Sequence, residues 1–491
     1  MIGDLRRDRG ALLLVAVLAL FLYESRAVGP QYDDAYISYR YAANLVAGHG
    51  LVFNPGERVE GISNLLWTLG VALGLSLGMG AREAGHALGV AGGALALIAT
   101  FAYGRAGVRR EQSAWAGVAA WLVLASPAFA RWSTSGMETP LFVAAVTGAL
   151  AAEAWGLRGL ATALVCVATG VRPEGALLAA SLFGFRLVTG GLRDARAWSS
   201  LVVYTLLWIA LTAFRLAYYG VPLPNTFYAK AGGVWLGVGA FFALVFALGN
   251  GGPCALLAAA ALARDRRAWP GAVFAGAMLV YGAWIGASPR YLLPVVPCLA
   301  ALGAWGAAAW WSRRGAFAAL AVAGLAFAAL LGFFGLTPPR GEGLAGFLAH
   351  PARTAGVASE REDDRRGELL AQSRVQLLRE RAQPVRLVAT GAIGAFGFES
   401  QLPILDILGL TDPLIARSGP PAAGAGFSLP GHQRSNAEYV LAREPDYILI
   451  GRGGGALPDS LVPAGAAIRA HPDLARHYAW DAEIIGFRRV R

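Results

Sequence analysis

Charged residues are scarce in this chain of 491 residues, since Asp, Glu, Lys and Arg together make up only 15% of it. A soluble chain usually carries about 25% charge, so a set of soluble domains and a disordered chain are both excluded. Apolar residues make up 56% of the chain, and the mean hydropathy is +0.50. Because they form long uninterrupted runs, the composition predicts a polytopic α-helical membrane protein with a further domain attached.

Cysteine is also rare, and its three positions are scattered. Cys166, Cys254 and Cys298 all lie in apolar runs, and no Cys-x-x-Cys spacing occurs. This arrangement excludes a disulfide scaffold and a cysteine metal site, so we expect three small core residues.

Lysine occurs once, at Lys230, among 42 basic residues, and the net charge is +11. Residues 1–335 hold 24 basic and 14 acidic residues, whereas residues 336–491 hold 18 and 17. The basic excess therefore lies between apolar runs, where basic loops typically face the cytoplasm. Membrane orientation explains the charge, and no nucleic-acid partner is expected.

Each membrane crossing needs about 20 apolar residues. The candidate spans are residues 11–29, 64–80, 84–103, 114–130, 139–156, 159–172, 174–189, 199–219, 238–263, 269–287, 291–311 and 315–335. The basic loops place the N-terminus in the cytoplasm, behind a retained signal-anchor, and residues 336–491 outside. Residues 64–103 break the alternation of external and cytoplasmic loops, because two apolar runs lie where one crossing is needed. Either one run is re-entrant or a third crossing is hidden, and we predict about 11 transmembrane helices.

The last third of the chain changes character. A charged stretch at 360–381 predicts a helix, and Asn436–Arg443 predicts another. Strand-like runs occur at Val385–Thr390, Pro403–Ile407, Tyr447–Ile450 and Ile484–Phe487. We therefore divide the chain into a transmembrane domain, 1–335, and a small external α/β domain, 336–491. The Gly391–Gly394 turn after the first strand fits a plain tight turn better than a phosphate loop.

The first external loop, residues 30–62, begins with the adjacent acids Asp33 and Asp34. Neighbouring carboxylates repel each other, which raises one pKa and suits a general base. The alternative is that both acids cap a helix at Ala35–Val46. Further acids follow at Glu138, which is also typical of a helix start, and at Glu174. We expect these acids to converge on one cavity at the outer membrane face.

Two cations are predicted on the same side of the membrane. Lys230 ends the segment Pro-Asn-Thr-Phe-Tyr-Ala-Lys, and Arg290 lies in Ser-Pro-Arg-Tyr between two spans. Either cation could extend to lipid headgroups, or the pair could bind a membrane-held phosphate. The tryptophans Trp67, Trp132 and Trp310–Trp311 fit an interfacial aromatic belt better than sugar stacking.

Together these motifs resemble GT-C glycosyltransferases, and in particular the mycobacterial terminal β-(1→2)-arabinofuranosyltransferase family. The resemblance rests on Asp-Asp-Ala-Tyr-Ile-Ser-Tyr-Arg from Asp33, Asn-Pro-Gly-Glu-Arg-Val-Glu-Gly from Asn54, and Ser-Gly-Met-Glu-Thr from Ser135. It also includes Arg-Pro-Glu-Gly from Arg172 and the tail segment Leu-Asp-Ile-Leu-Gly-Leu-Thr-Asp-Pro from Leu405. Each motif is weak alone, and their order along most of the chain is more specific.

The resemblance implies an inverting sugar transfer from a polyprenyl-phosphate donor to an envelope glycan or lipid, in a bacterial inner membrane. Asp33 or Asp34 would be the base, while Lys230, Arg290 and Arg172 would bind the donor phosphate. The candidate substrate-binding residues are Arg40, His49, Asn54, Glu57, Glu60, Glu138, Glu174, Asn225 and Tyr228. Asp406, Asp412 and His432 are candidate acceptor residues, although strand-end and turn roles suit the two aspartates equally well.

Some GT-C relatives use a divalent metal, and carboxylate oxygens are the ligands that Mg²⁺ prefers. The sequence has no His-rich or Cys ligand set, so neither a metal nor another cofactor is assigned. The alternative function is a transporter or flippase for a lipid or small solute. Transporters typically contain internal repeats and ionisable groups near the midplane, whereas here no repeat is evident and the acids cluster in a loop.

Overall fold

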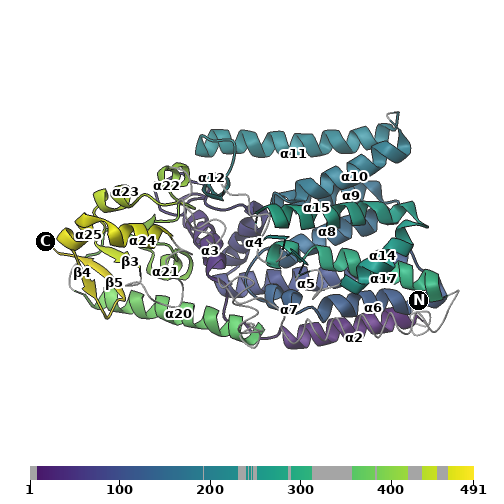
Figure 1. The fold of residues 1–491 in the computed structure, drawn as a ribbon, viewed down its shortest axis with the longest axis horizontal. Coiled ribbons are helices and arrows are strands. Elements are labelled where there is room, and N and C mark those ends of the chain that lie inside the picture. The colour runs from purple at the N-terminus through teal and green to yellow at the C-terminus, as the bar shows by residue number, and fades with distance from the viewer. Residues whose placement is uncertain are drawn as a thin grey trace.

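The computed structural model describes residues 8–191, 193–230, 239–240, 243–244, 246, 252–285, 289–311, 357–381, 384–418, 434–450 and 463–490. A bundle of helices and a smaller C-terminal part lie end to end (Figure 1). The predicted span 315–335 lies outside the described residues, and the predicted span 238–263 is described only in part.

Long apolar helices build the bundle. They are α2 (Arg9–Glu24), α5 (Ala81–Ala106), α6 (Ala114–Leu124), α8 (Thr139–Ala154), α9 (Arg158–Val171), α10 (Gly175–Gly190), α11 (Ala195–Tyr219), α14 (Gly252–Leu262), α15 (Trp269–Ile285) and α17 (Val295–Trp311). Among the described residues, Ala81–Ala106, Ala195–Tyr219 and Arg266–Ile285 are long and apolar enough to cross a membrane. The helical membrane-type architecture is thus confirmed, although most helices are shorter than the predicted spans.

The two apolar runs in residues 64–103 form unequal helices. The first, α4 (Leu65–Ser76), has 12 residues, which span about 18 Å, whereas the hydrocarbon core is about 30 Å thick. The second, α5, has 26 residues and packs closely on α8. A Cβ atom added to Gly92 would lie 2.7 Å from the backbone nitrogen of Leu141, so this close approach requires glycine. Only α5 has the length of a crossing, which favours the re-entrant alternative for α4.

Further helices and turns connect these apolar helices. They are α3 (Asp33–Val46), α4, α7 (Pro127–Ser133), α12 (Asn225–Lys230), α16 (Pro289–Leu292) and the 3₁₀ turns η1 (Arg110–Gln112) and η2 (Arg266–Ala268). Helices α3 and α12 lie at the end of the bundle that faces the C-terminal part (Figure 1). Helix α3 contacts α21 of that part, and α12 contacts α22.

The C-terminal part contains a five-stranded sheet with the order β2-β1-β3-β5-β4. The strands are β1 (Val388–Thr390), β2 (Ile404–Asp406), β3 (Tyr447–Leu449), β4 (Tyr478–Asp481) and β5 (Gly486–Arg489). Strand β1 pairs in parallel with β2, Val388 opposite Ile404, and with β3, Val388 opposite Tyr447. Strands β4 and β5 form an antiparallel hairpin at the edge. The four predicted strands are present, and β4 was not predicted.

Helices flank this sheet. They are α21 (Gly394–Ser400), α22 (Pro413–Arg417), α23 (Ala437–Ala442), α24 (Pro463–Ala470) and α25 (Pro472–His477). Alternating strands and helices give the α/β arrangement that the sequence predicts. The buried core of the sheet includes Ala389, Leu405 and Ile448.

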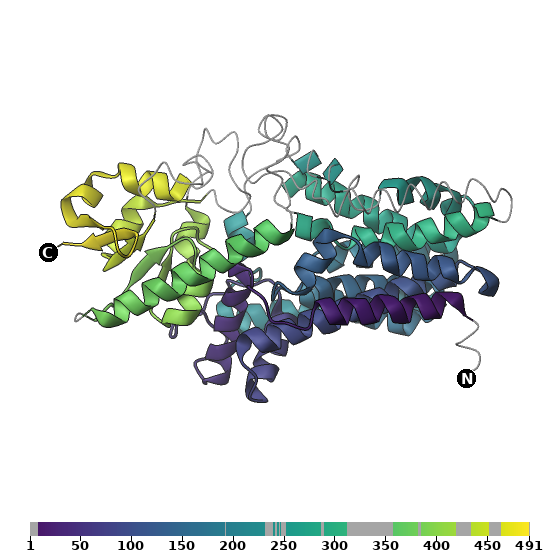
Figure 2. The same cartoon turned by 90° about the horizontal axis from the view of Figure 1, so that it is seen from below.

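One long helix, α20 (Val357–Glu380), runs from the C-terminal part toward the bundle (Figure 2). At one end, Arg374 donates a hydrogen bond to the carbonyl of Ile484 at 2.9 Å. At the middle of the helix, Glu368 accepts hydrogen bonds from the Tyr36 hydroxyl at 2.5 Å and from the backbone of Gln31 at 2.9 Å. Helix α20 therefore fixes the C-terminal part to the segment that begins α3.

Candidate active site

The first predicted aspartate, Asp33, is bound to the C-terminal part. Helix α3 begins at Asp33, two residues earlier than predicted. The Asp33 carboxylate accepts hydrogen bonds from the backbone N–H groups of Gly394 at 3.2 Å and Ala395 at 2.8 Å. It thereby caps α21, whose N-cap residue Ile393 supplies no side-chain hydrogen bond. The Gly391–Gly394 turn is thus a tight turn whose helix-starting N–H groups are occupied by a carboxylate.

The environment of Asp33 also changes its proton affinity. Burial raises its pKa to about 6, the N–H donor of Ala395 opposes the rise, and the charge of Asp34 adds to it. Because the carboxylate is occupied by backbone donors, Asp33 is poorly placed to receive a proton from a substrate. Asp33 instead contributes to the contact between the helical bundle and the C-terminal part, which we call the joint.

The second aspartate, Asp34, faces the bundle. Its carboxylate lies 3.0 Å from the Nη2 atom of Arg290, and its side chain is 38% exposed, against 11% for Arg290. Arg290 lies in α16, far along the chain, so the fold brings together the predicted acid and the predicted cation. Of the two adjacent acids, Asp34 is the one that a substrate could reach.

Arg290 is held by aromatic rings and keeps unused donors. Its guanidinium carbon lies 5.4 Å from the ring centre of Tyr32, 5.8 Å from that of Trp132 and 5.2 Å from that of Tyr291. Its Nε and Nη1 atoms are buried and have no hydrogen-bond partner within the described part of the chain. Since a buried guanidinium normally satisfies its donors, this geometry suits an anion that completes them.

Lys230 is the second cation near this point. It ends α12, its side chain is exposed, and it forms no ion pair with the residues that the structure describes. The guanidinium carbons of Arg172 and Arg290 lie 4.4 and 5.2 Å from the ring centre of the partly buried Tyr291, and the charge of Lys230 also acts on this phenol. The arrangement concentrates positive charge beside Asp34.

Arg172 differs from the other two cations because its charge is already balanced. It donates to Glu138 at 2.5 Å and to both carboxylate oxygens of Glu174, at 3.2 and 3.0 Å. All three side chains are buried. Glu138 directly precedes α8, but its carboxylate makes no capping hydrogen bond and accepts from Arg172 and from the Asn64 amide at 3.0 Å instead. This geometry favours a structural role for the cluster of Arg172, Glu138 and Glu174 over direct phosphate binding by Arg172.

Arg40 and Asn54 belong to the joint with the C-terminal part. Buried Arg40 donates to the carbonyls of Phe53, Gly397 and Leu402 at 2.7 to 2.8 Å, and to the Asn54 amide oxygen at 3.2 Å. Asn54 in turn exchanges two hydrogen bonds with the backbone of Ile404. These donors are occupied by protein, so the geometry favours a structural role over the predicted substrate contact.

Asn225 and Glu60 support the same joint. The Asn225 amide donates to the carbonyls of Gly409 at 2.8 Å and Leu410 at 3.0 Å. The Glu60 carboxylate pairs with Arg215 of α11 through two hydrogen bonds, at 2.8 and 3.2 Å. Both side chains are buried. Asn225 bonds directly to the C-terminal part, whereas the Glu60–Arg215 pair lies within the bundle, and the Glu60 carbonyl accepts from the Asn225 N–H group at 2.9 Å.

Three other predicted substrate-binding positions lie apart from Asp34. His49 is exposed beyond the far end of α3, which is about 18 Å along the helix from Asp34. Glu57 is exposed and accepts a hydrogen bond from Asn54 at 2.9 Å. The ring of Tyr228 lies under the guanidinium of Arg417, 4.3 Å away. Their geometry provides no contact with the Asp34–Arg290 pair.

Both candidate acceptor aspartates accept hydrogen bonds from backbone N–H groups of their own turns. Asp406 accepts from the backbone N–H groups of Leu408 at 2.9 Å and Thr411 at 2.8 Å, and burial raises its pKa to about 6. Asp412 caps α22 by accepting from Leu414 and Ile415, both at 2.9 Å. These contacts favour the turn alternative. His432 lies outside the described residues.

The sequence analysis missed several residues that complete the site. Tyr32 and Trp132 pack edge to face, with ring centres 5.3 Å apart, and Trp132 and Trp67 are buried in the protein rather than placed in an interfacial belt. Arg131 pairs with Asp364 of α20. The Arg131–Trp132 pair is separated from the Ser-Gly-Met-Glu motif by only two residues, and this closeness was the signal that could have identified it. Among the described residues, no three His, Cys, Asp or Glu side chains form a group that could hold a metal ion.

Comparisons with known proteins agree with this architecture. A family model described as a domain of unknown function, DUF8728, matches residues 362–486, which lie within the predicted C-terminal domain. The terminal β-(1→2)-arabinofuranosyltransferase of Mycobacterium tuberculosis is 31% identical over 229 residues, covering 41% of this chain and 35% of that protein. The chain therefore matches about a third of the length of that curated relative.

Solved structures cover much more of the chain. ArnT from Cupriavidus metallidurans, bound to undecaprenyl phosphate, aligns with a TM-score of 0.55 and 16% identity over 80% of this chain and 85% of that one. The Archaeoglobus fulgidus oligosaccharyltransferase in its apo form aligns with a TM-score of 0.51 and 12% identity over 80% and 64%. The predicted resemblance is confirmed at the level of the fold: the chain has the fold of the GT-C glycosyltransferase superfamily.

Proposed function

We propose that this protein is an inverting GT-C glycosyltransferase that moves a sugar from a polyprenyl-phosphate donor to a hydroxyl group of an envelope glycan or lipid. The observation that carries the proposal is the pairing of the accessible Asp34 carboxylate with Arg290 at 3.0 Å. A base and a cation with unused donors lie side by side, and Lys230 adds a second positive charge. A proton-accepting group and a phosphate-binding group are the two functions that the reaction needs.

In the proposed reaction, Asp34 takes the proton of the acceptor hydroxyl as its oxygen attacks the anomeric carbon of the donor sugar. A glycosidic bond forms on one face of the sugar while the bond from the anomeric carbon to the phosphate oxygen breaks on the other. The lipid leaves as a phosphate monoester, and Arg290 and Lys230 stabilise the charge that develops on it. Asp33 holds α21 in place and takes no proton.

The finer assignment is an arabinofuranose-type donor used at the extracytoplasmic face of a bacterial inner membrane, with about 11 crossings and an external domain from residue 336 onward. The partial sequence match to the mycobacterial arabinofuranosyltransferase supports the choice of sugar. The basic loops between the apolar runs support the orientation.

The direct test supplies purified full-length protein with polyprenyl-phosphate arabinofuranose and an oligosaccharide acceptor, without any ion gradient, and detects products by mass spectrometry. We expect free polyprenyl phosphate and an acceptor that has gained one sugar. Intact donor that crosses liposome membranes without any glycosidic product would contradict the proposal and support a flippase. Equal use of a mannose donor would contradict the sugar assignment and leave the reaction class standing.

A further inference from the structure

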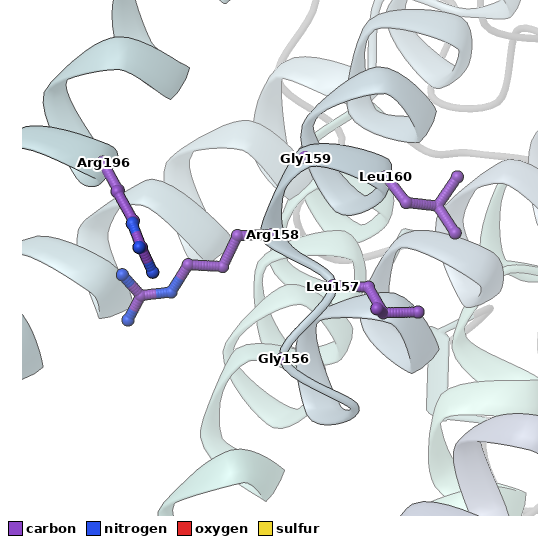
Figure 3. Close-up of a pocket in the computed structure, with 6 residues that line it drawn as sticks. All are labelled: Gly156, Leu157, Arg158, Gly159, Leu160 and Arg196. Atoms are coloured by element: carbon purple, nitrogen blue, oxygen red, sulfur yellow. The ribbon is translucent and has the colours of Figure 1, made fainter.

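A pocket of about 500 Å³ opens at the end of the bundle remote from Asp34 (Figure 3). It is lined by Gly156, Leu157, Arg158, Gly159, Leu160 and Arg196. These residues belong to the start of α9 and the first turn of α11. Since α9 has 14 residues between Arg158 and Val171, its length of about 21 Å separates this pocket from Arg172 and the candidate active site.

Two arginines supply the charge of this pocket. Arg158 donates to Asp194 at 2.8 Å and is 36% exposed. Arg196 is exposed and forms no ion pair with any residue that the structure describes. Both side chains extend into the same side of the pocket (Figure 3). One carboxylate therefore faces two guanidinium groups, which leaves an excess positive charge.

The backbone that lines the pocket is also not covered by other atoms of the protein. A Cβ atom added to Gly156 or Gly159 would have no atom within 4 Å. The N-cap residue of α9, Leu157, supplies no side-chain hydrogen bond to the first turn, so the leading N–H groups of this helix lack an intrahelical partner. Together with the two arginines, these donors give the pocket the chemistry of an anion site.

Apolar side chains adjoin these polar groups. Leu157 is 55% exposed and Leu160 is 52% exposed. Trp155 and Trp198, the aromatic type enriched at membrane interfaces, are exposed nearby in the sequence. Helix α11 continues away from the pocket with an exposed apolar face that includes Val202. A free anion would not use these surfaces, whereas a lipid would place its phosphate at the arginines and its acyl chains along the leucines and α11.

We propose that this pocket binds the headgroup phosphate of an anionic glycerophospholipid, held by Arg158 and Arg196 together with the first turn of α9. Basic pockets between helices are typical sites for such headgroups. The lipid would bridge α9 and α11. Helix α11 has few protein contacts of its own, because only 17% of its apolar 18-residue segment is buried inside the protein. The site is separate from the donor site and does not depend on the proposed transfer reaction.

The test uses the delipidated full-length protein in mild detergent and counts bound lipids by native mass spectrometry. The probes are phosphatidylglycerol, phosphatidylcholine and inorganic phosphate. The variant Arg196→Gln removes an exposed cation and leaves the cap of α11 by Asp194 intact. Its matched control is Arg193→Gln, which removes the same charge from an exposed position outside the lining of the pocket.

We expect phosphatidylglycerol to bind the unaltered protein and Arg193→Gln alike, and to bind Arg196→Gln about fivefold more weakly, since each basic residue near the surface contributes about that factor. Phosphatidylcholine, whose net charge is zero, should bind more weakly than phosphatidylglycerol. Equal losses in Arg193→Gln and Arg196→Gln would overturn the proposal, because the effect would then be one of overall charge. Complete displacement of the lipid by an equal concentration of inorganic phosphate would overturn the lipid assignment in favour of a free anion. Unchanged binding in the double variant Arg158→Gln/Arg196→Gln would overturn the site itself.

Discussion

The joint between the two parts of the molecule and the cluster around Asp34 use the same residue types in opposite ways. In the joint, Asp33 and Arg40 direct their polar atoms to backbone partners. Around Asp34, Arg290 keeps two buried donors without a partner among the described residues, and Lys230 forms no ion pair there. Satisfied polar groups hold a structure together, whereas unsatisfied ones beside an accessible carboxylate indicate where a substrate is bound. We therefore propose different roles for the two neighbouring aspartates.

The largest expected effect separates these two aspartates by activity. Asp34→Asn should lower the rate of sugar transfer about 100-fold to 10,000-fold, the usual contribution of a general base. Asp33→Asn keeps one oxygen that can accept the shorter of the two α21 bonds, from the Ala395 N–H group, and loses the longer one from Gly394. Most of the activity should therefore remain. The measurement is the initial rate of polyprenyl phosphate release at equal amounts of folded protein. A larger loss in Asp33→Asn than in Asp34→Asn would reverse the assignment.

The second comparison separates two arginines by activity and stability. Arg290→Gln should slow transfer about 100-fold, because one charged donor to the leaving group is lost, and should change the thermal midpoint little. Arg172→Gln leaves Glu138 and Glu174 buried without their cation, which should destabilise the protein by about 3–5 kcal/mol. Thermal unfolding in detergent and transfer rates are measured for both variants. Equal thermal midpoints for the two variants would contradict the distinction between a structural Arg172 and a phosphate-binding Arg290.

Arg40 tests the joint itself. Arg40→Met removes four hydrogen bonds and leaves the Leu402 carbonyl without its donor. The carbonyls of Phe53 and Gly397 keep bonds from Asn44 and Gln401. We expect a loss of stability of about 2–3 kcal/mol, with the rate per folded molecule largely retained. The matched control Arg58→Met changes an exposed arginine of the same loop and should shift stability by less than about 0.5 kcal/mol. Similar thermal midpoints for the two variants would show that Arg40 does not secure the joint.

The smallest expected effect is a pH dependence that comes from Asp33. Its pKa is raised to about 6 from 3.8, so between these values the folded protein binds more protons at this group than the unfolded chain. The contribution of Asp33 to stability is therefore largest below pH 4 and falls as the pH rises through about 6. Asp33→Asn should remove this part of the slope, which is at most about 3 kcal/mol for the full shift and smaller because the side chain is only partly buried. If the thermal midpoints of the unaltered protein and of Asp33→Asn change in parallel between pH 4 and 7, this pH dependence does not come from Asp33.

Local patterns in the sequence predicted much of the fold. Hydrophobic runs identified the helical bundle, and strand-like runs such as Pro403–Ile407 identified most of the sheet. Asn436 was predicted to begin a helix, and it is the N-cap of α23, where its side chain accepts a hydrogen bond from Tyr439. The edge strand β4 was missed, since only Tyr478 of Tyr478–Asp481 is buried.

The candidate site was only partly predictable. Asp34, Arg290 and Lys230 were singled out by residue type and predicted side of the membrane, and the fold brings them together. The separate role of Asp33 depends on backbone N–H groups 361 and 362 positions away in the chain, which no local pattern reveals. Arg40 likewise resembled a substrate-binding cation, because its backbone partners belong to a distant helix. Long-range hydrogen bonds, rather than residue types, decide which polar groups remain available.

The most direct test of the account is the binding of polyprenyl phosphate without its sugar, measured at equilibrium with the purified full-length protein. The account predicts that Arg290→Gln binds this lipid at least about tenfold more weakly, which corresponds to about 1.4 kcal/mol. Arg193→Gln, which removes the same charge at the other end of the bundle, should bind it like the unaltered protein. Equal dissociation constants for all three proteins would show that the cations beside Asp34 do not hold the lipid phosphate, and would contradict the central claim.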